Sequence, residues 1–226
     1  MTALGRRALA ELIGTAFLVA TVVGSGIAAS RLSPGDVGLQ LLENSLITGA
    51  ALIALILALQ PVSAAFNPVV TLAEVGLGLL RGRDAGVLVV AQVIGGAMGA
   101  VIANLMFDLD AVTLSTHERT GAGLWLGEVV ATFGLLVVIF GSVRSGRTET
   151  IAYAVGGYIT AAYWFTSSTS FANPAVTLAR TLSDTFAGIS PGSVPGFVLA
   201  QLVGAALAVL VVRVLFPHPR LPQESA

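Results

Sequence analysis

Two stretches of the sequence place Asn followed by Pro at the start of nearly the same apolar phrase. FNPVVTLAE begins at Phe66, and ANPAVTLAR begins at Ala172. An Asn amide both donates and accepts hydrogen bonds, Asn is a favoured N-cap, and Pro suits the first helical turn, where its missing N–H costs nothing. The phrases therefore predict two helix starts that are rich in hydrogen-bond donors. The motif residues are Asn67, Pro68, Val69, Asn173, Pro174 and Ala175.

Two acids lie inside long apolar segments, where an ionisable side chain is expected to be functional. Glu11 stands four residues before Thr15, and Glu128 stands four residues before Thr132. The acids could carry protons in a transporter. Alternatively, they could accept hydrogen bonds from the loops beside the Asn-Pro motifs and hold those loops in place. Because one Glu-Thr pair occurs in each half of the chain, the second interpretation is favoured.

Gln92 and Gln201 are polar residues of two later apolar segments. They could line a pore, but we expect them to tie loop backbone to the surrounding helices. No two acids or His stand at metal-ligand spacing, no G-x-x-x-x-G-K-[ST] is present, and no nucleophile–base pair can be named. The sequence therefore predicts no metal site, no cofactor and no enzymatic activity, and it argues against ATP-driven pumping.

The composition places these residues in a lipid bilayer. Of the 226 residues, 55% are hydrophobic and 10% are charged, whereas a soluble domain is about a quarter charged. The net charge of −1 argues against nucleic acid as a partner. Six apolar runs are long enough to cross a membrane. They cover residues 8–29, 41–60, 85–107, 121–143, 149–167 and 194–216.

Three sequence blocks occur twice in the same order. The E-x-x-x-T block of residues 11–15 returns at 128–132, the Asn-Pro block returns, and A-Q-x-x-G of residues 91–95 returns at 200–204. Each half contains three spans, an odd number, so the second half must be inverted relative to the first. Inverted repeats with broken helices are a transport architecture. We predict a single channel domain over residues 1–226. Its first repeat covers residues 8–107, and its second covers residues 121–216.

Two further apolar pieces, residues 67–80 and 173–187, are too short to cross a membrane alone. We predict half-helices that enter from opposite faces and meet N-terminus to N-terminus near the bilayer centre. Non-helical backbone survives at that depth only where it is buried in protein or lines water. Since each helix N-terminus carries roughly half a positive charge, the meeting point would be positive and rich in donors.

The Arg residues predict how the spans are oriented. With six spans, eight of the eleven basic residues fall on one side of the membrane, and an excess of basic residues marks the cytoplasmic side. These eight are Arg6, Arg7, Arg81, Arg83, Arg144, Arg147, Arg213 and Arg220. We therefore expect a multi-pass protein of the cell (inner) membrane with both termini in the cytoplasm.

The repeated motifs resemble those of the aquaporin (major intrinsic protein) family. The resemblance rests on both Asn-Pro half-helices and on the repeated E-x-x-x-T and A-Q-x-x-G blocks, and it covers nearly the whole chain. It implies an all-α membrane fold of six transmembrane helices plus two re-entrant half-helices, with one pore in each subunit of a homotetramer. The first motif departs from the family pattern at Val69, where Ala is usual.

In this family, four positions near the outer mouth set the width of the pore. Matched by motif, they fall on Thr48, Ala161, Ser170 and Val176. Water-selective members carry an Arg directly after the second Asn-Pro-Ala, where this chain has Val. Arg180 stands one helical turn later, and we expect it to pair with an acid or to face lipid headgroups. The resemblance implies a wide mouth of small side chains without the usual fixed cation.

A wide and weakly polar mouth suits an uncharged solute larger than water. The Thr and Val of this filter resemble a bacterial subgroup of aquaglyceroporin-like channels associated with arsenic resistance. The resemblance implies a passive channel for small neutral solutes, among them metalloid hydroxides such as arsenous acid, and also glycerol or water. The alternatives are an ordinary water or glycerol channel and a secondary transporter, which also uses inverted repeats.

Overall fold

The computed structural model describes residues 1–217, and regular structure within them is helical throughout. The expectation of an all-α membrane fold is confirmed, while Arg220 lies outside the described residues. The α-helices are α1 (Ala3–Leu32), α2 (Val37–Leu59), α3 (Pro68–Gly76), α4 (Gly82–Met106), α5 (Ala122–Arg144), α6 (Ile151–Phe165), α7 (Pro174–Ala179) and α8 (Val194–Leu215).

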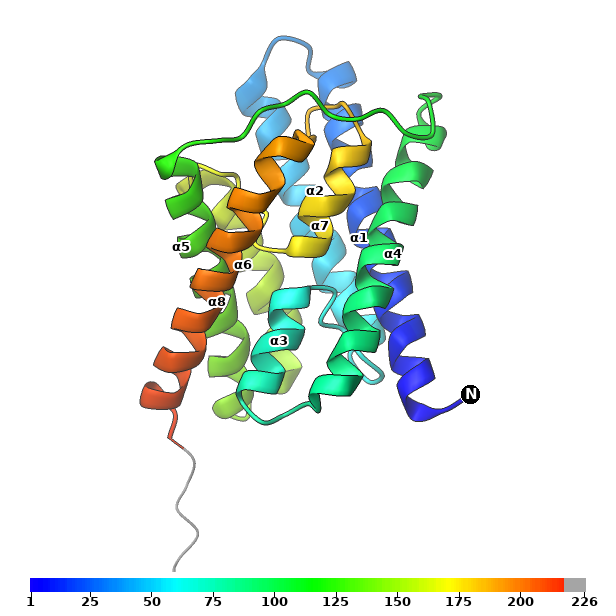
Figure 1. Cartoon of the computed structure of the whole chain (residues 1–226). Coiled ribbons are helices and arrows are strands. Elements are labelled where there is room, and N and C mark those ends of the chain that lie inside the picture. The colour runs from blue at the N-terminus through cyan, green and yellow to red at the C-terminus, as the bar shows by residue number, and fades with distance from the viewer. Residues whose placement is uncertain (218–226) are drawn as a thin grey trace, which may run out of the picture.

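The two short helices, α3 and α7, lie one above the other between α4 and α8 and complete the bundle of six longer helices (Figure 1). Five of the described helices, namely α1, α2, α4, α5 and α8 with its preceding turn, are long and apolar enough to cross a membrane. The sixth, α6, has 15 residues and follows the 3-10 turn Thr148–Thr150. Fifteen helical residues rise roughly 22 Å, so α6 is a short span that the 3-10 turn extends.

Both half-helices are shorter than the sequence predicts. α3 ends at Gly76 because the chain turns back there: Gly78 has a φ of +77°, and the N–H of Leu79 donates to Glu74 O at 2.8 Å. α7 ends at Ala179 and continues as a 3-10 turn. The carbonyls that would extend α7 accept instead from the loop between α4 and α5. These bonds run from Thr113 N to Leu182 O and from Ser115 N to Thr181 O.

Glycines let neighbouring helices touch backbone to backbone, at matched places in the two halves. A Cβ on Gly95 of α4 would lie 2.2 Å from Leu12 O of α1, and one on Gly99, a turn later, would lie 2.2 Å from Ala16 O. In the second half, a Cβ on Gly204 of α8 would lie 2.5 Å from Val129 O of α5. Small residues are the common means of close helix contact in membranes, and here they hold α1 against α4 and α5 against α8.

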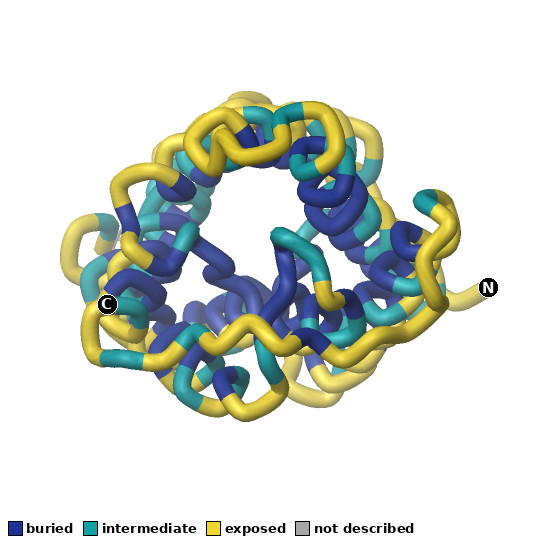
Figure 2. The backbone as a smooth tube through the Cα atoms, turned by 90° about the horizontal axis from the view of Figure 1, so that it is seen from above, coloured by how far each residue is buried: buried dark blue, intermediate teal, exposed yellow. Residues whose placement is uncertain are grey.

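The outside of the helix ring is where the exposed residues gather, while buried backbone lies on the inside (Figure 2). Large apolar side chains such as Phe17, Val90 and Leu199 are exposed on α1, α4 and α8, as expected for helices that face lipid. The N-terminus and the end of α8 lie at the same end of the bundle (Figure 1). At this end Arg213 donates to Gly76 O, the last carbonyl of α3.

We expect Gly99→Ala to destabilise the bundle, because the new methyl group would meet the backbone of α1 and push α4 outward. Overpacking of this kind costs typically about 1–3 kcal/mol. Gly86→Ala on the same helix is the matched control, since a Cβ there meets nothing within 4 Å. Thermal unfolding in detergent should show a lower midpoint for Gly99→Ala only. Equal midpoints for the two variants would contradict the close contact.

Candidate transmembrane pore

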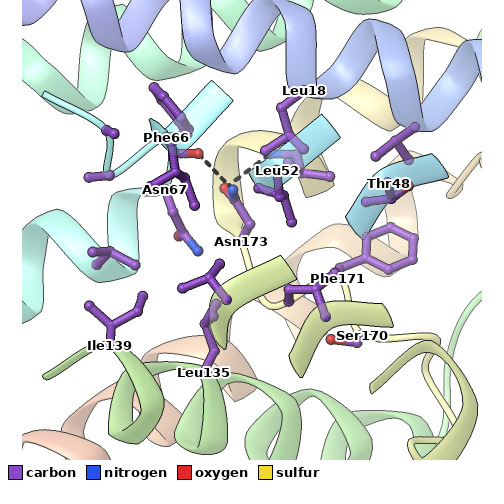
Figure 3. A pocket seen from close by; sticks show the side chains of 18 of the residues that line it. Leu18, Thr48, Leu52, Phe66, Asn67, Leu135, Ile139, Ser170, Phe171 and Asn173 are labelled. Atoms are coloured by element: carbon purple, nitrogen blue, oxygen red, sulfur yellow. Dashed lines mark hydrogen bonds between the residues drawn. The ribbon is translucent and has the colours of Figure 1, made fainter. Parts of the chain in front are cut away.

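A cavity lies inside the helix ring and follows α6 over nearly its whole length, from Ile151 to Tyr163. Most of its wall is apolar. These wall residues include Leu18, Val22, Leu52, Ile56, Leu135, Ile139, Val155 and Ile159. The loops before α3 and α7 supply the polar side of the lining, including Asn67 and Asn173 (Figure 3). A mostly apolar channel with one polar side suits the passage of small, weakly hydrated solutes.

The two Asn side chains cap their own half-helices and bind the opposite loop. Asn67 Oδ1 accepts from Val69 N at 3.1 Å, and its Nδ2 donates to Ala172 O at 2.8 Å. Asn173 Oδ1 accepts from Ala175 N at 3.0 Å, and its Nδ2 donates to Phe66 O at 2.8 Å (Figure 3). Each amide carries a second N–H. Donation of these N–H groups to a passing solute stays a prediction.

The residue before each Asn has a backbone conformation that L-residues rarely adopt. Phe66 has a φ of 48° and Ala172 has a φ of 47°. A non-Gly residue held in the left-handed region costs on the order of 1–3 kcal/mol and persists only where its surroundings fix it. Here the carbonyl of each residue accepts a hydrogen bond from the Asn of the other half-helix. The two strained conformations therefore allow the two loops to bind each other.

Glu11 gathers the donors of the first loop. Its Oε1 accepts from Ser63 Oγ at 2.5 Å and from Ala65 N at 2.9 Å. Its Oε2 accepts from Phe66 N at 2.6 Å and from Gln92 Nε2 at 2.8 Å. Both carboxylate oxygens are therefore occupied by neighbours from the loop and from α4, as the loop-anchoring interpretation requires.

Glu128 repeats this arrangement in the second half. It accepts from Phe171 N at 2.8 Å and from Ala172 N at 2.9 Å. Gln201 donates to the same carboxylate at 2.6 Å and to Thr177 Oγ1 of α7 at 2.9 Å. The Gln side chain thus bridges the acid and the half-helix, and it is not among the residues that line the cavity.

Three of the four expected filter residues line the cavity, and the fourth does not. Thr48, Ser170 and Val176 are in the lining. Ala161 is exposed on the outer face of α6, so its assignment to the mouth is wrong. Tyr163 takes its place, with its hydroxyl 3.3 Å from Thr48 Oγ1.

The position of Tyr163 follows from helical periodicity. The residues of α6 that line the cavity recur every fourth position, at Ile151, Val155, Ile159 and Tyr163. Residues four apart share a face of an α-helix, and Ala161 lies off that face. The sequence shows this spacing but not which face of α6 lines the cavity, so only the structure distinguishes Tyr163 from Ala161.

Arg180 also differs from expectation. Its side chain is 3% exposed and lines the cavity, so it does not face lipid headgroups. Its Nε donates to Ala187 O, and its Cζ lies 3.4 Å from the centroid of the Phe171 ring. Among residues 1–217, no carboxylate forms an ion pair with it. The cavity lining therefore contains a guanidinium, contrary to the sequence-based expectation of a filter without a cation.

A second Arg approaches the same ring from the loop of residues 107–121, which crosses the end of the bundle opposite the N-terminus (Figure 1). Arg119 Nε donates to Gly188 O at 2.9 Å, and its Cζ lies 5.1 Å from the Phe171 ring centroid. Burial lowers the pKa of the Arg119 guanidinium, but an Arg side chain keeps its charge at neutral pH. Two cations thus lie beside one aromatic ring.

Comparison with known proteins gives consistent results over nearly the whole chain. Residues 2–151 and 142–225 match the family described as "Major intrinsic protein". The chain is 50% identical to the aquaglyceroporin AqpS of Rhizobium meliloti over 218 residues, covering 96% of this chain and 93% of that protein. It is 32% identical to the aquaporin AqpM of Methanothermobacter thermautotrophicus, covering 95% of this chain and 99% of that protein.

Solved structures share the fold. The X-ray structure of the aquaglyceroporin from Plasmodium falciparum superposes with a TM-score of 0.69 and covers 92% of this chain and 93% of that one. The sequence identity of this pair is 20%, so the likeness concerns the arrangement of the helices alone.

We expect Glu11→Leu to abolish folding, because it leaves four donors without their acceptor. Each buried unsatisfied donor costs about 1–3 kcal/mol. Glu11→Gln keeps one acceptor oxygen and should retain most conduction. Glu149→Leu, at an exposed site, is the control. The yield of monodisperse protein and solute flux in proteoliposomes measure the difference. Full function of Glu11→Leu would contradict the anchoring role.

Proposed function

Because this chain belongs to the major intrinsic protein family and is a membrane channel for small solutes, we propose that it is a wide aquaglyceroporin-like channel. The solutes that it passes are small uncharged hydroxylated molecules, including metalloid hydroxides such as arsenous acid, together with glycerol or water. Flow is passive and follows the concentration gradient of the solute.

The side chain at position 176 carries this proposal. Val176 directly follows Asn173-Pro174-Ala175, is 5% exposed and lines the cavity. An Arg there would extend a long side chain with five donors into the path. Val is shorter and uncharged, so the path beside α7 is wider at this level.

Hydroxyl groups beside Val176 support a hydroxylated solute. Thr48, Tyr163 and Ser170 all line the cavity with Val176. A hydroxyl both donates and accepts, so these three side chains can exchange bonds with the hydroxyls of a polyol or of arsenous acid, which is neutral at pH 7. The 50% identity to a protein named aquaglyceroporin also favours a solute larger than water.

The remaining assignments belong to the same proposal. We place the chain in the cell (inner) membrane as one channel domain of two inverted repeats, with both termini in the cytoplasm. We expect four copies to assemble, each with its own pore and with Asn67 and Asn173 donating to the solute. The anchoring roles of Glu11 and Glu128 favour a channel over a proton-coupled transporter, because donors from the protein occupy both carboxylates.

A stopped-flow panel on proteoliposomes tests the proposal with water, glycerol, urea and arsenous acid. Flux of glycerol and arsenous acid well above that of empty vesicles, linear in concentration and independent of a proton gradient, is expected. Water flux alone would indicate an ordinary water channel. Saturable uptake driven by protons would indicate a transporter.

We expect Val176→Arg to cut the flux of glycerol-sized solutes at least about tenfold, equivalent to ~1.4 kcal/mol of added barrier. The guanidinium would narrow the path, while water, being smaller, should pass with less loss. Val112→Arg, at an exposed site in the loop of residues 107–121, is a control for the added charge. The measurement is flux at matched channel amounts. Unchanged glycerol flux would mean that position 176 does not limit the path.

A further inference from the structure

We propose that Arg180, together with Ser170, forms a fixed cationic site for solute oxygen atoms at the outer mouth, and that Arg180 excludes cations there. The inference rests on the proposed channel function. It assigns the fixed charge to a position four residues beyond the one at which the family resemblance places it.

The position of Arg180 between two cavities motivates the proposal. A second cavity lies on the outer side and is lined by Val37, Leu41, Asn44, Arg119, Tyr163, Thr169, Arg180 and Phe186. Tyr163 and Arg180 line both this outer cavity and the central one. A solute that moves from one cavity to the other must therefore pass the Tyr163 hydroxyl and the Arg180 guanidinium.

Helix geometry explains how Arg180 reaches this boundary. Val176 and Arg180 are four residues apart, and the N–H of Arg180 donates to Val176 O. Side chains four apart share a face, and a long side chain leans back over the preceding turn. The guanidinium of Arg180 is thereby directed toward the level of Val176. The small Val side chain leaves that space open.

The guanidinium is held in place but keeps donors to offer. Ala187 O binds its Nε, and the Phe171 ring lies against its Cζ at 3.4 Å. Phe197 packs edge-on against this ring, with 5.1 Å between the two ring centroids. Within the described residues, neither terminal nitrogen of Arg180 has a hydrogen-bond partner, and no acid neutralises the charge. A positioned guanidinium with free N–H groups is suited to bind oxygen.

Ser170 provides an independent indication of a ligand. It is 4% exposed and lines the central cavity, and among residues 1–217 its Oγ has no hydrogen-bond partner. A buried hydroxyl without a partner costs about 1–3 kcal/mol. Ser170 and Phe171 lie together at one end of the cavity (Figure 3). An oxygen of a passing solute would supply the partner that the Ser170 hydroxyl lacks.

Removal of the charge gives the first test. Arg180→Met keeps an unbranched apolar chain and should raise proton and K⁺ conductance in planar bilayers by at least about tenfold, a ~1.4 kcal/mol lower barrier. Glycerol flux in proteoliposomes should fall, because the donors of Arg180 to solute oxygen are lost, but it should stay above that of empty vesicles. Arg119→Met is the matched control, because Arg119 contacts the same ring but lines the outer cavity alone. It should change cation conductance much less.

Restoration of the charge gives the second test, which this chain permits because it contains no Cys. Arg180→Cys should leak cations like Arg180→Met. Reaction with 2-aminoethyl methanethiosulfonate adds an ammonium group at this position and should restore exclusion. The negatively charged sulfonatoethyl reagent should not. Wild-type protein, which lacks thiols, should respond to neither reagent.

Three outcomes would overturn the proposal. One is unchanged cation conductance in an Arg180→Met channel that still passes glycerol. Another is equal leakage in Arg119→Met. The third is loss of folded protein in both Arg180 variants, which would make this guanidinium a structural cation of the loop. Failure of the channel proposal is a separate result, since it would show as wild-type glycerol flux no greater than that of empty vesicles.

Discussion

Backbone N–H and C=O groups that leave a helix in the middle of a bilayer must find partners inside the protein, because lipid offers none. Two loops of this chain meet that constraint. Glu11 and Glu128 accept from the N–H groups of the loops, and Asn67 and Asn173 donate to carbonyls of the opposite loop. The carboxylates and amides thus let non-helical backbone exist where the cavity needs a polar side.

This pairing sets requirements for the surrounding helices. Glu11 of α1 accepts both from the first loop and from Gln92 of α4. It can do both only if α1 lies close to α4. Gly95 and Gly99 allow this approach, since a Cβ at either would overlap the backbone of α1. Close helix packing and buried hydrogen bonding therefore depend on each other, and the bundle cannot loosen without leaving loop donors unpaired.

The sequence predicts the fold well because its strongest signals are local or repeated. An Asn-Pro at a helix start and an acid inside an apolar run can each be recognised from a few adjacent residues. The ends of the half-helices are predicted poorly, since the carbonyls of Thr181 and Leu182 bind a distant loop, a tertiary event. Ala161 is not at the mouth because it lies off the face of α6 that lines the cavity, and motif matching does not show which face that is. The burial of Arg180 depends on Phe171 and Ala187, which composition and spacing do not bring together.

Position 176 and position 180 constrain each other through charge as well as space. Both residues line the cavity, one helical turn apart on α7 and the turn that follows it. Two unit charges about 4 Å apart repel by roughly 4 kcal/mol at an effective dielectric constant near 20. Because no acid among residues 1–217 pairs with the buried Arg180, a neutral residue is favoured at 176, and the small apolar side chain of Val meets this requirement. Val176 at the motif position and Arg180 one turn later are therefore explained together, since only one of the two positions carries the charge. In this arrangement the guanidinium lies toward the wall, against the Phe171 ring, so a fixed charge and a wide path can occur at the same mouth.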